Sequence, residues 1–126
     1  MATEEQFGYK GNYGMELVAD IRGCDFSGLT QKTLGDFLIA LVEHVKMVRH
    51  GEPLMWEDHS GIPHLDGISA IQFIETSNVV CHALNLTSTM YLNLFSCREF
   101  DPEDALKFVM EYWKATDENH TVLARV

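Results

Sequence analysis

The chain has 126 residues, 46% of them hydrophobic and 10% aromatic, which is enough for one domain with its own core and argues against disorder. A formal net charge of −10 argues against nucleic-acid binding, because phosphate recognition needs a basic face; the charge is typical of a soluble protein and compatible with a cationic substrate. No stretch approaches the roughly 18 apolar residues of a membrane span, and the acidic N-terminus lacks the apolar region of a signal peptide.

The first half of the chain predicts a strand followed by a long helix. Residues 1–12 are polar and contain glycine, so we expect a loose N-terminal segment. Met15–Ile21 alternates as a strand does. Thr30–Val48 has its apolar residues at helical spacing, with Thr30 as the N-cap, and the helix should stop before Gly51. Leu54–Glu57 is compatible with a short strand.

The second half predicts three strands, a helix and a final strand. The strands, at 68–75, 78–84 and 89–96, are rich in β-branched and aromatic residues and are separated by polar breaks. Asp101 followed by Pro102 is typical of a helix start, and residues 121–126 read as the last strand.

The order βαβββαβ indicates an α+β fold, a two-layer sandwich in which two helices cover one face of a largely antiparallel sheet over a single domain, 1–126. Such a sandwich leaves the other sheet face uncovered by its own helices. A symmetric partner is the usual solution, so we expect a homodimer.

Three residues carry the functional signal: Ser77, His82 five residues later, and Cys97 fifteen residues after that. Their flanks fit a single pattern, in order and without a gap. It runs from Gly14 and the Cys24-Asp25 pair, through Gly67-Ile68-Ser69-Ala70, to Phe95-Ser96-Cys97 and Asp101-Pro102. In this pattern the chain resembles the small bacterial and archaeal S-adenosylmethionine decarboxylases, proenzymes that make a pyruvoyl cofactor from an internal serine.

The resemblance implies autocatalytic cleavage between Thr76 and Ser77. The Ser77 hydroxyl would attack the preceding carbonyl, and loss of the serine α-proton would expel the resulting ester and leave a pyruvoyl group. His82 would serve as the base or proton relay of that elimination, and Ser69 would orient Ser77 or the ester oxyanion. The pyruvoyl ketone then forms a Schiff base with the substrate amine and accepts the electron pair left by carbon dioxide. Cys97 would reprotonate the α-carbon.

Departures from the family pattern leave the substrate open. The family has Glu-Ser-His around the cut, where this chain has Thr76-Ser77-Asn78, with Glu75 displaced by one position. The family's Trp-Pro-Glu segment, which provides an aromatic surface and a ribose-binding acid, falls here on Leu84, Asn85 and Leu86. Leucine cannot accept a hydrogen bond from a ribose hydroxyl, so an efficient S-adenosylmethionine enzyme would need other residues, such as Trp56 or Phe7, for nucleoside binding.

Three functions therefore remain: a decarboxylase for S-adenosylmethionine in polyamine (spermidine) biosynthesis, a pyruvoyl enzyme for a smaller amino acid such as arginine or ornithine, and a non-processing homologue with a binding or regulatory role. Taken singly, Ser77 also fits a turn residue, His82 a core histidine and Cys97 a small buried side chain. His59 and His64 lack a third ligand at diagnostic spacing, so no metal is expected. Three cysteines without a CxxC spacing indicate free thiols and a cytoplasmic protein.

Overall fold

The computed structural model describes residues 11–126, so the predicted loose segment at 1–12 lies almost wholly outside the described part of the chain. The elements in chain order are β1 (Gly14–Arg22), α1 (Gln31–His44), β2 (Leu54–Asp58), β3 (Gly67–Ile74), β4 (Ser77–Leu84), β5 (Thr89–Ser96), α2 (Pro102–Tyr112) and β6 (Asp117–Arg125).

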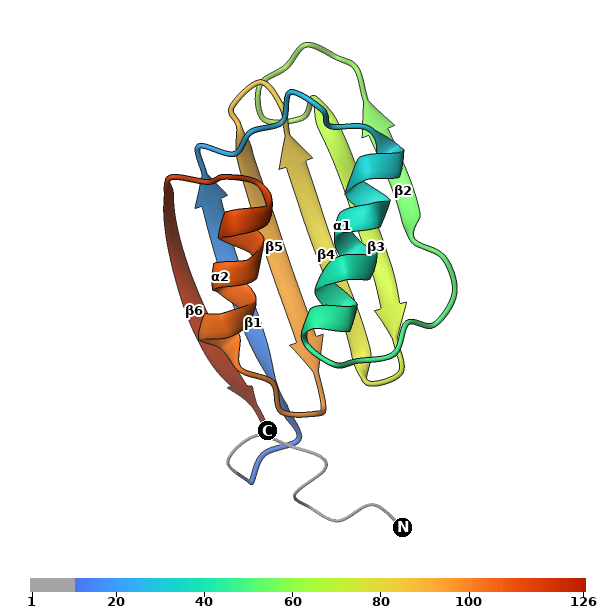
Figure 1. Ribbon diagram of the computed structural model, residues 1–126, viewed down its shortest axis with the longest axis vertical. Coiled ribbons are helices and arrows are strands. Elements are labelled where there is room, and N and C mark those ends of the chain that lie inside the picture. Colours follow the sequence, from blue (N-terminus) through green and yellow to red (C-terminus); the bar gives the residue numbers. More distant parts are fainter. Residues whose placement is uncertain (1–10) are drawn as a thin grey trace.

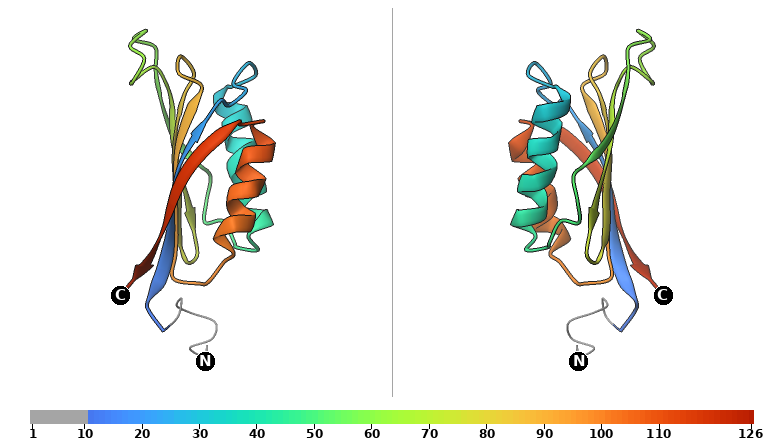
Figure 2. Two further views of the ribbon diagram at one scale, coloured as in Figure 1. Left: turned by 90° about the vertical axis from the view of Figure 1, so that its left-hand side faces the viewer. Right: turned by 90° about the vertical axis from the view of Figure 1, so that its right-hand side faces the viewer.

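All strands join one antiparallel sheet in the order β2-β3-β4-β5-β1-β6 (Figure 1). Both helices lie against the same face of it, which confirms the predicted two-layer α+β sandwich (Figure 2). The short segment at Leu54 is a true strand at the sheet edge, so the full order is βαββββαβ.

The helix starts follow the sequence signals, whereas two other boundaries do not. Thr30 caps α1 in a reciprocal capping box with Thr33, and Asp101 caps α2 through the backbone N–H of Asp104. Helix α1 ends at His44, short of the predicted Val48, because Lys46 turns into the left-handed region with φ 61°.

Strand β6 begins at Asp117 rather than at Thr121. Its polar start is held in the sheet by β1, since Arg22 pairs in register with Asp117 and its guanidinium binds the Asp117 carboxylate at 2.8 Å. The hydrophobic pattern alone does not predict that residues 117–120, which are all polar, belong to a strand.

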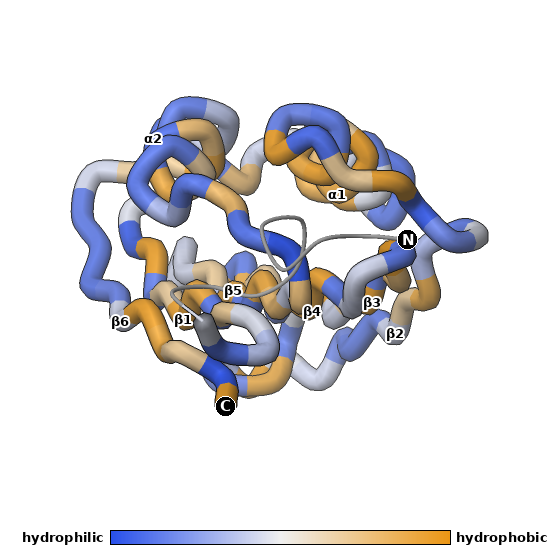
Figure 3. The backbone as a smooth tube through the Cα atoms, turned by 90° about the horizontal axis from the view of Figure 1, so that it is seen from below, coloured by the Kyte–Doolittle hydropathy of each residue, from blue (hydrophilic) through white to orange (hydrophobic). Residues whose placement is uncertain are grey.

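The core lies between the helices and the inner face of the sheet (Figure 3). Inward residues of β1, β4 and β5, such as Leu17, Val79 and Leu94, are fully buried, as are Phe37 and Leu41 of α1.

The opposite sheet face, here called the open face, is not covered by any helix in residues 11–126 (Figure 2). By strand alternation it carries Trp56, Phe73, Tyr91 and Leu123, all exposed. Large apolar side chains on one face are typical of an interaction surface.

Candidate active site

Ser69 and His82 form a hydrogen-bonded pair on the open face. They are direct partners in the register of β3 and β4, and Ser69 Oγ lies 2.7 Å from His82 Nδ1. The imidazole is exposed, and its Nε2 is left available for an exchange of protons. The structure therefore brings together two of the four predicted site residues as an oriented hydroxyl–imidazole pair.

The predicted cleavage point lies at the tight turn between β3 and β4. Ile74 pairs with Ser77, so Glu75 and Thr76 form a two-residue turn and Ser77 is the first residue of β4. The backbone N–H of Cys97 donates to the carbonyl oxygen of Thr76 at 3.0 Å. This is the carbonyl that Ser77 would attack, so a hydrogen-bond donor already lies where negative charge would develop.

A buried hydroxyl, Ser96 Oγ, supports the same turn. Ser96 is fully buried and lies directly opposite Ser77 in the register of β4 and β5. Its Oγ donates to Thr76 Oγ1 at 2.9 Å and accepts from the backbone N–H of Arg98, also at 2.9 Å. One hydroxyl thus ties the residue before the cut to the segment that carries Cys97.

Gly14 permits the close approach of β1 to this segment. A Cβ on Gly14 would collide with the carbonyl oxygen of Ser96 and lie 2.7 Å from the Cα of Cys97. A side chain there would displace the backbone that donates to Thr76, which gives a physical reason for the glycine in the sequence pattern.

One chain does not bring all four predicted residues together. Ser77 and His82 are five residues apart on β4, or about 17 Å at the usual rise of a strand. Strand alternation also directs Ser77 toward the face of Val79 and Cys81, whereas His82 is on the open face. The cleavage half (Thr76, Ser77, Ser96 and Cys97) and the acid–base half (Ser69 and His82) are therefore separate within a protomer.

The three cysteines are free and differ in access to solvent. Burial raises the pKa of the Cys24 thiol to about 11 and that of Cys81 to about 12, so both stay protonated and inert at neutral pH. Cys97 is partly exposed at the end of β5, where a thiol can meet a substrate.

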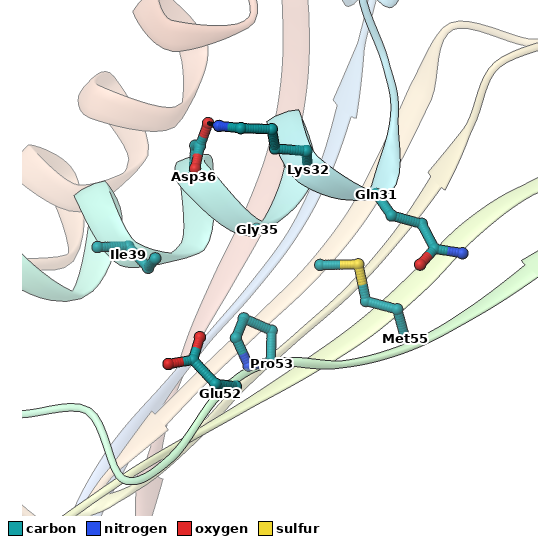
Figure 4. Close-up of a pocket in the computed structure, with 8 residues that line it drawn as sticks. All are labelled: Gln31, Lys32, Gly35, Asp36, Ile39, Glu52, Pro53 and Met55. Carbon is teal, nitrogen blue, oxygen red and sulfur yellow. Dashed lines mark hydrogen bonds and ion pairs between the residues drawn. The ribbon is translucent and has the colours of Figure 1, made fainter.

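A hollow of about 420 Å³ lies between α1 and β2, away from these residues (Figure 4). Lys32 and Asp36 form an ion pair of 2.9 Å at its rim. The described residues that line it include no serine, cysteine or histidine, so it lacks the groups of the predicted chemistry.

Within residues 11–126, no group of three His, Cys, Asp or Glu side chains could hold a metal ion, and no helix has the length and hydropathy to cross a membrane.

The sequence pattern identified Ser77, His82, Ser69 and Cys97 but missed Ser96 and the backbone N–H of Cys97. A signal for Ser96 was present, because it continues the inward series of Met90, Leu92 and Leu94 with a polar residue. A buried polar side chain at a core position usually has a specific partner.

The comparisons with known proteins agree with this architecture. A search of curated protein sequences finds no match. Among solved structures, the adenosylmethionine decarboxylase from Aquifex aeolicus VF5 is similar in fold, with a TM-score of 0.75 at 14% identity over 90% of this chain and 91% of that one. The family model described as S-adenosylmethionine decarboxylase matches residues 15–126. The chain therefore belongs to the S-adenosylmethionine decarboxylase family.

Proposed function

We propose that this chain is a self-processing, pyruvoyl-dependent decarboxylase that makes its cofactor from Ser77 and acts on S-adenosylmethionine in polyamine biosynthesis. The family as a whole consists of pyruvoyl-dependent decarboxylases, and the family match spans residues 15–126. The observation that carries the proposal for this chain is the hydrogen bond from the Cys97 N–H to the Thr76 carbonyl oxygen. The three free cysteines support a cytoplasmic setting.

The cleavage begins when Ser77 Oγ attacks the Thr76 carbonyl carbon and transfers its proton to the departing nitrogen. The carbon–nitrogen bond breaks, and Thr76 becomes an ester on the serine oxygen. The Cys97 N–H stabilises the oxyanion of this step, because it lies at hydrogen-bond distance from the carbonyl oxygen beforehand.

A base then removes the Ser77 α-proton, and its electron pair expels the Thr76 carboxylate. Hydrolysis of the dehydroalanine with loss of ammonia leaves the pyruvoyl group at the start of residues 77–126. When formed, this group accepts the electrons that carbon dioxide leaves on the substrate. His82, oriented by Ser69 at 2.7 Å, is the base.

Because His82 and Ser77 are distant within one chain, the proposal includes a homodimer with composite sites. A two-fold axis that crosses β4 near its middle, between two open faces, would bring the acid–base half of one chain to the end of the partner's β4 that carries Ser77. Because Ser77 lies on the core side of β4, the proposal includes a movement of the Glu75-Thr76 turn that brings Ser77 to the open face. The exposed apolar side chains of the open face support this contact.

Cys97 is proposed as the acid that reprotonates the substrate α-carbon. It is partly exposed and directly follows the strand opposite the cut. We expect Cys97→Ala to cleave itself normally, turn over slowly and lose activity during turnover. A variant with normal, lasting activity would remove Cys97 from the mechanism.

The test of the proposal is the mass of the purified chain under denaturing conditions. We expect two fragments, residues 1–76 and a pyruvoyl-bearing 77–126, and an intact Ser77→Ala variant. Ser88→Ala is the matched control, because Ser88 is a turn residue between β4 and β5 away from the cut. An intact wild-type mass after long incubation would contradict self-processing and favour the non-processing homologue.

A further inference from the structure

The side chain of Thr76 joins two segments that reach the cleavage turn from opposite sides of the β3–β4 hairpin. One is β5, which pairs with β4, and the other is the connection from α1 to β2, which bridges to the end of β3 at Arg49. Thr76 Oγ1 accepts a hydrogen bond from Ser96 Oγ of β5 at 2.9 Å and donates one to Met47 Sδ of the connection at 3.6 Å. Ser96 is fully buried and Met47 is 8% exposed, so both partners of the Thr76 hydroxyl belong to the core.

These hydrogen bonds run in one direction. The backbone N–H of Arg98 donates to Ser96 Oγ, which in turn donates to Thr76 Oγ1. The Thr76 hydroxyl directs its own proton at Met47 Sδ, a weak acceptor at which the chain of hydrogen bonds ends. Because the hydroxyl accepts from one side and donates to the other, the two contacts fix the rotation of the β-branched Thr76 side chain about its Cα–Cβ bond.

The backbone of the turn gives a reason for such contacts. Two-residue hairpin turns that match the twist of their strands have positive φ at one or both central residues. Neither Glu75 nor Thr76 is among the described residues with positive φ. The turn is therefore not of the self-stabilising kind, and it is held from outside the hairpin. On the side of the α1–β2 connection, the Val48 carbonyl also accepts from the Glu75 N–H at 2.9 Å.

We propose that Thr76 is a positioning residue for self-cleavage, an inference that rests on the proposed function. When the turn brings Ser77 to the open face, the Thr76 carbonyl has to stay near the Cys97 N–H, because that donor stabilises the oxyanion. A Thr76 hydroxyl bound to Ser96 and Met47 keeps this carbonyl in place while Ser77 turns about it. The family pattern has a glutamate at this position, so the role is specific to this chain.

Hydroxylamine measures the step on which Thr76 acts. Its nitrogen attacks the carbonyl carbon of the ester, the bond to the Ser77 oxygen breaks, and that oxygen takes a proton, which leaves a hydroxamate on residue 76. In a His82→Ala parent chain the elimination lacks its base, so hydroxylamine-dependent cleavage reports ester formation alone. Thr76→Val keeps the shape but not the hydroxyl and should lower this rate by about two- to thirteenfold, as loss of one buried hydrogen bond does. Thr76→Ser should restore it.

Met47→Leu tests the same contact from its other end, and it protects the test if Thr76→Val fails to fold, because it conserves the volume of a buried apolar side chain. It should also slow ester formation, by a smaller factor, since a thioether is a weak acceptor. In a Thr76→Val chain it should have no further effect, because no hydroxyl is left to orient. Additive effects of the two substitutions, or a Met47→Leu chain that forms ester at the parent rate, would contradict the proposed contact.

Thr87→Val is the matched control. Thr87 is exposed in the turn at the opposite end of β4, where its hydroxyl donates to the Leu84 carbonyl at 3.5 Å, and its replacement should not change the rate. Thr76→Glu, which restores the residue of the family pattern, should be as slow as Thr76→Val. A carboxylate cannot replace a hydroxyl between two buried, uncharged partners. Normal ester formation in Thr76→Val, with a lower Tm or with slow elimination only, would overturn the positioning role.

The wild-type chain separates this inference from the proposed function. If the wild type cleaves itself and Thr76→Val forms ester as fast as its parent, the proposed function stands and the role of Thr76 is wrong. If the wild type stays intact and hydroxylamine does not cleave the His82→Ala chain, self-processing itself is wrong.

Discussion

The backbone N–H of Cys97 donates at 3.0 Å to the carbonyl oxygen of Thr76, the residue immediately before the proposed cut. The contact depends on the pairing of β4 with β5 and on the lack of a side chain at Gly14. The cleavage half is therefore built mainly by the backbone, and its side-chain support comes from Ser96.

We expect Ser96→Ala to slow self-cleavage. The change leaves the Arg98 N–H and the Thr76 hydroxyl without their 2.9 Å partner, so the turn before Ser77 loses its fixed position. Loss of a buried hydrogen bond costs about 0.5–1.5 kcal/mol, which corresponds to a cleavage rate about two- to thirteenfold lower if it acts in the transition state. The time course of the intact mass measures it.

The conservative variant Ser96→Thr, which keeps the hydroxyl, should restore the cleavage rate. If Ser96→Ala lowers the Tm but cleaves at the wild-type rate, Ser96 has a structural role only.

The proposed composite site predicts complementation between two inactive variants. Ser77→Ala chains lack the nucleophile and His82→Ala chains lack the base, so neither should cleave alone. In a mixed dimer, Ser77 of the His82→Ala chain meets His82 of the Ser77→Ala chain. Mass spectrometry of the co-expressed pair should therefore find cleavage of His82→Ala chains only.

Failure of the co-expressed chains to cleave, although native mass spectrometry resolves mixed dimers, would place the whole site within one protomer. A monomer at micromolar concentration would contradict the dimer itself.

Residues in the site show how far the sequence could predict the structure. The spacing of Ser77, His82 and Cys97 indicated the family, but the strand bounds predicted on either side of Ser77 differ by one residue from the end of β3 and the start of β4. Thr76, Ser77 and Asn78 are all turn formers, so strands at 68–75 and 78–84 placed the turn one residue too late. Moving the turn to Glu75 and Thr76 pairs Ser69 with His82 instead of Leu84.

Helix starts were predictable because caps are local signals: Thr30 and Asp101 both cap as expected. The start of β6 was not predictable from local sequence, because its polar residues pair with β1, which lies about a hundred residues earlier in the chain. The distance between Ser77 and His82 was likewise hard to predict. Five residues are far apart along a strand but close along a helix, so the distance depends on the strand assignment.

A pH-dependent contribution to stability is expected from His120, which links β6 to α2. Its ring contacts Glu118 at 2.8 Å and Glu103 at 3.1 Å. The hydrogen bond to Glu118, followed by that to Glu103, raises the pKa of His120 above its ordinary value. A histidine with a raised pKa in the folded state stabilises the fold fully below its unfolded pKa, about 6.5, and loses this contribution as the pH rises through the folded value.

His120→Gln should therefore lower the Tm by about 1–4 °C between roughly pH 5 and 6.5, with a smaller difference at higher pH. His59→Gln is the control, since His59 is an exposed loop residue beside one carboxylate at 3.4 Å. A Tm difference that stays constant or grows toward alkaline pH would contradict the assignment.

The last prediction concerns the ribose of the substrate. Leu84 ends β4 on the face of His82, and Leu86 is 52% exposed in the turn that follows. Neither accepts a hydrogen bond, and a ribose hydroxyl buried without a partner costs about 1–3 kcal/mol, or about five- to 140-fold in binding. We therefore expect weak turnover of S-adenosylmethionine relative to a typical family member, and a gain in Leu86→Glu, which restores an acceptor.

Carbon dioxide release from S-adenosylmethionine, arginine, ornithine and lysine at equal concentrations measures this expectation. Leu65→Glu is the control, because it adds the same charge at another exposed leucine, which is 48% accessible. Efficient and exclusive use of S-adenosylmethionine by the wild type would contradict the ribose argument, because it would require another acceptor. Preferential use of arginine or ornithine would support the loss of ribose recognition and contradict the proposed action on S-adenosylmethionine.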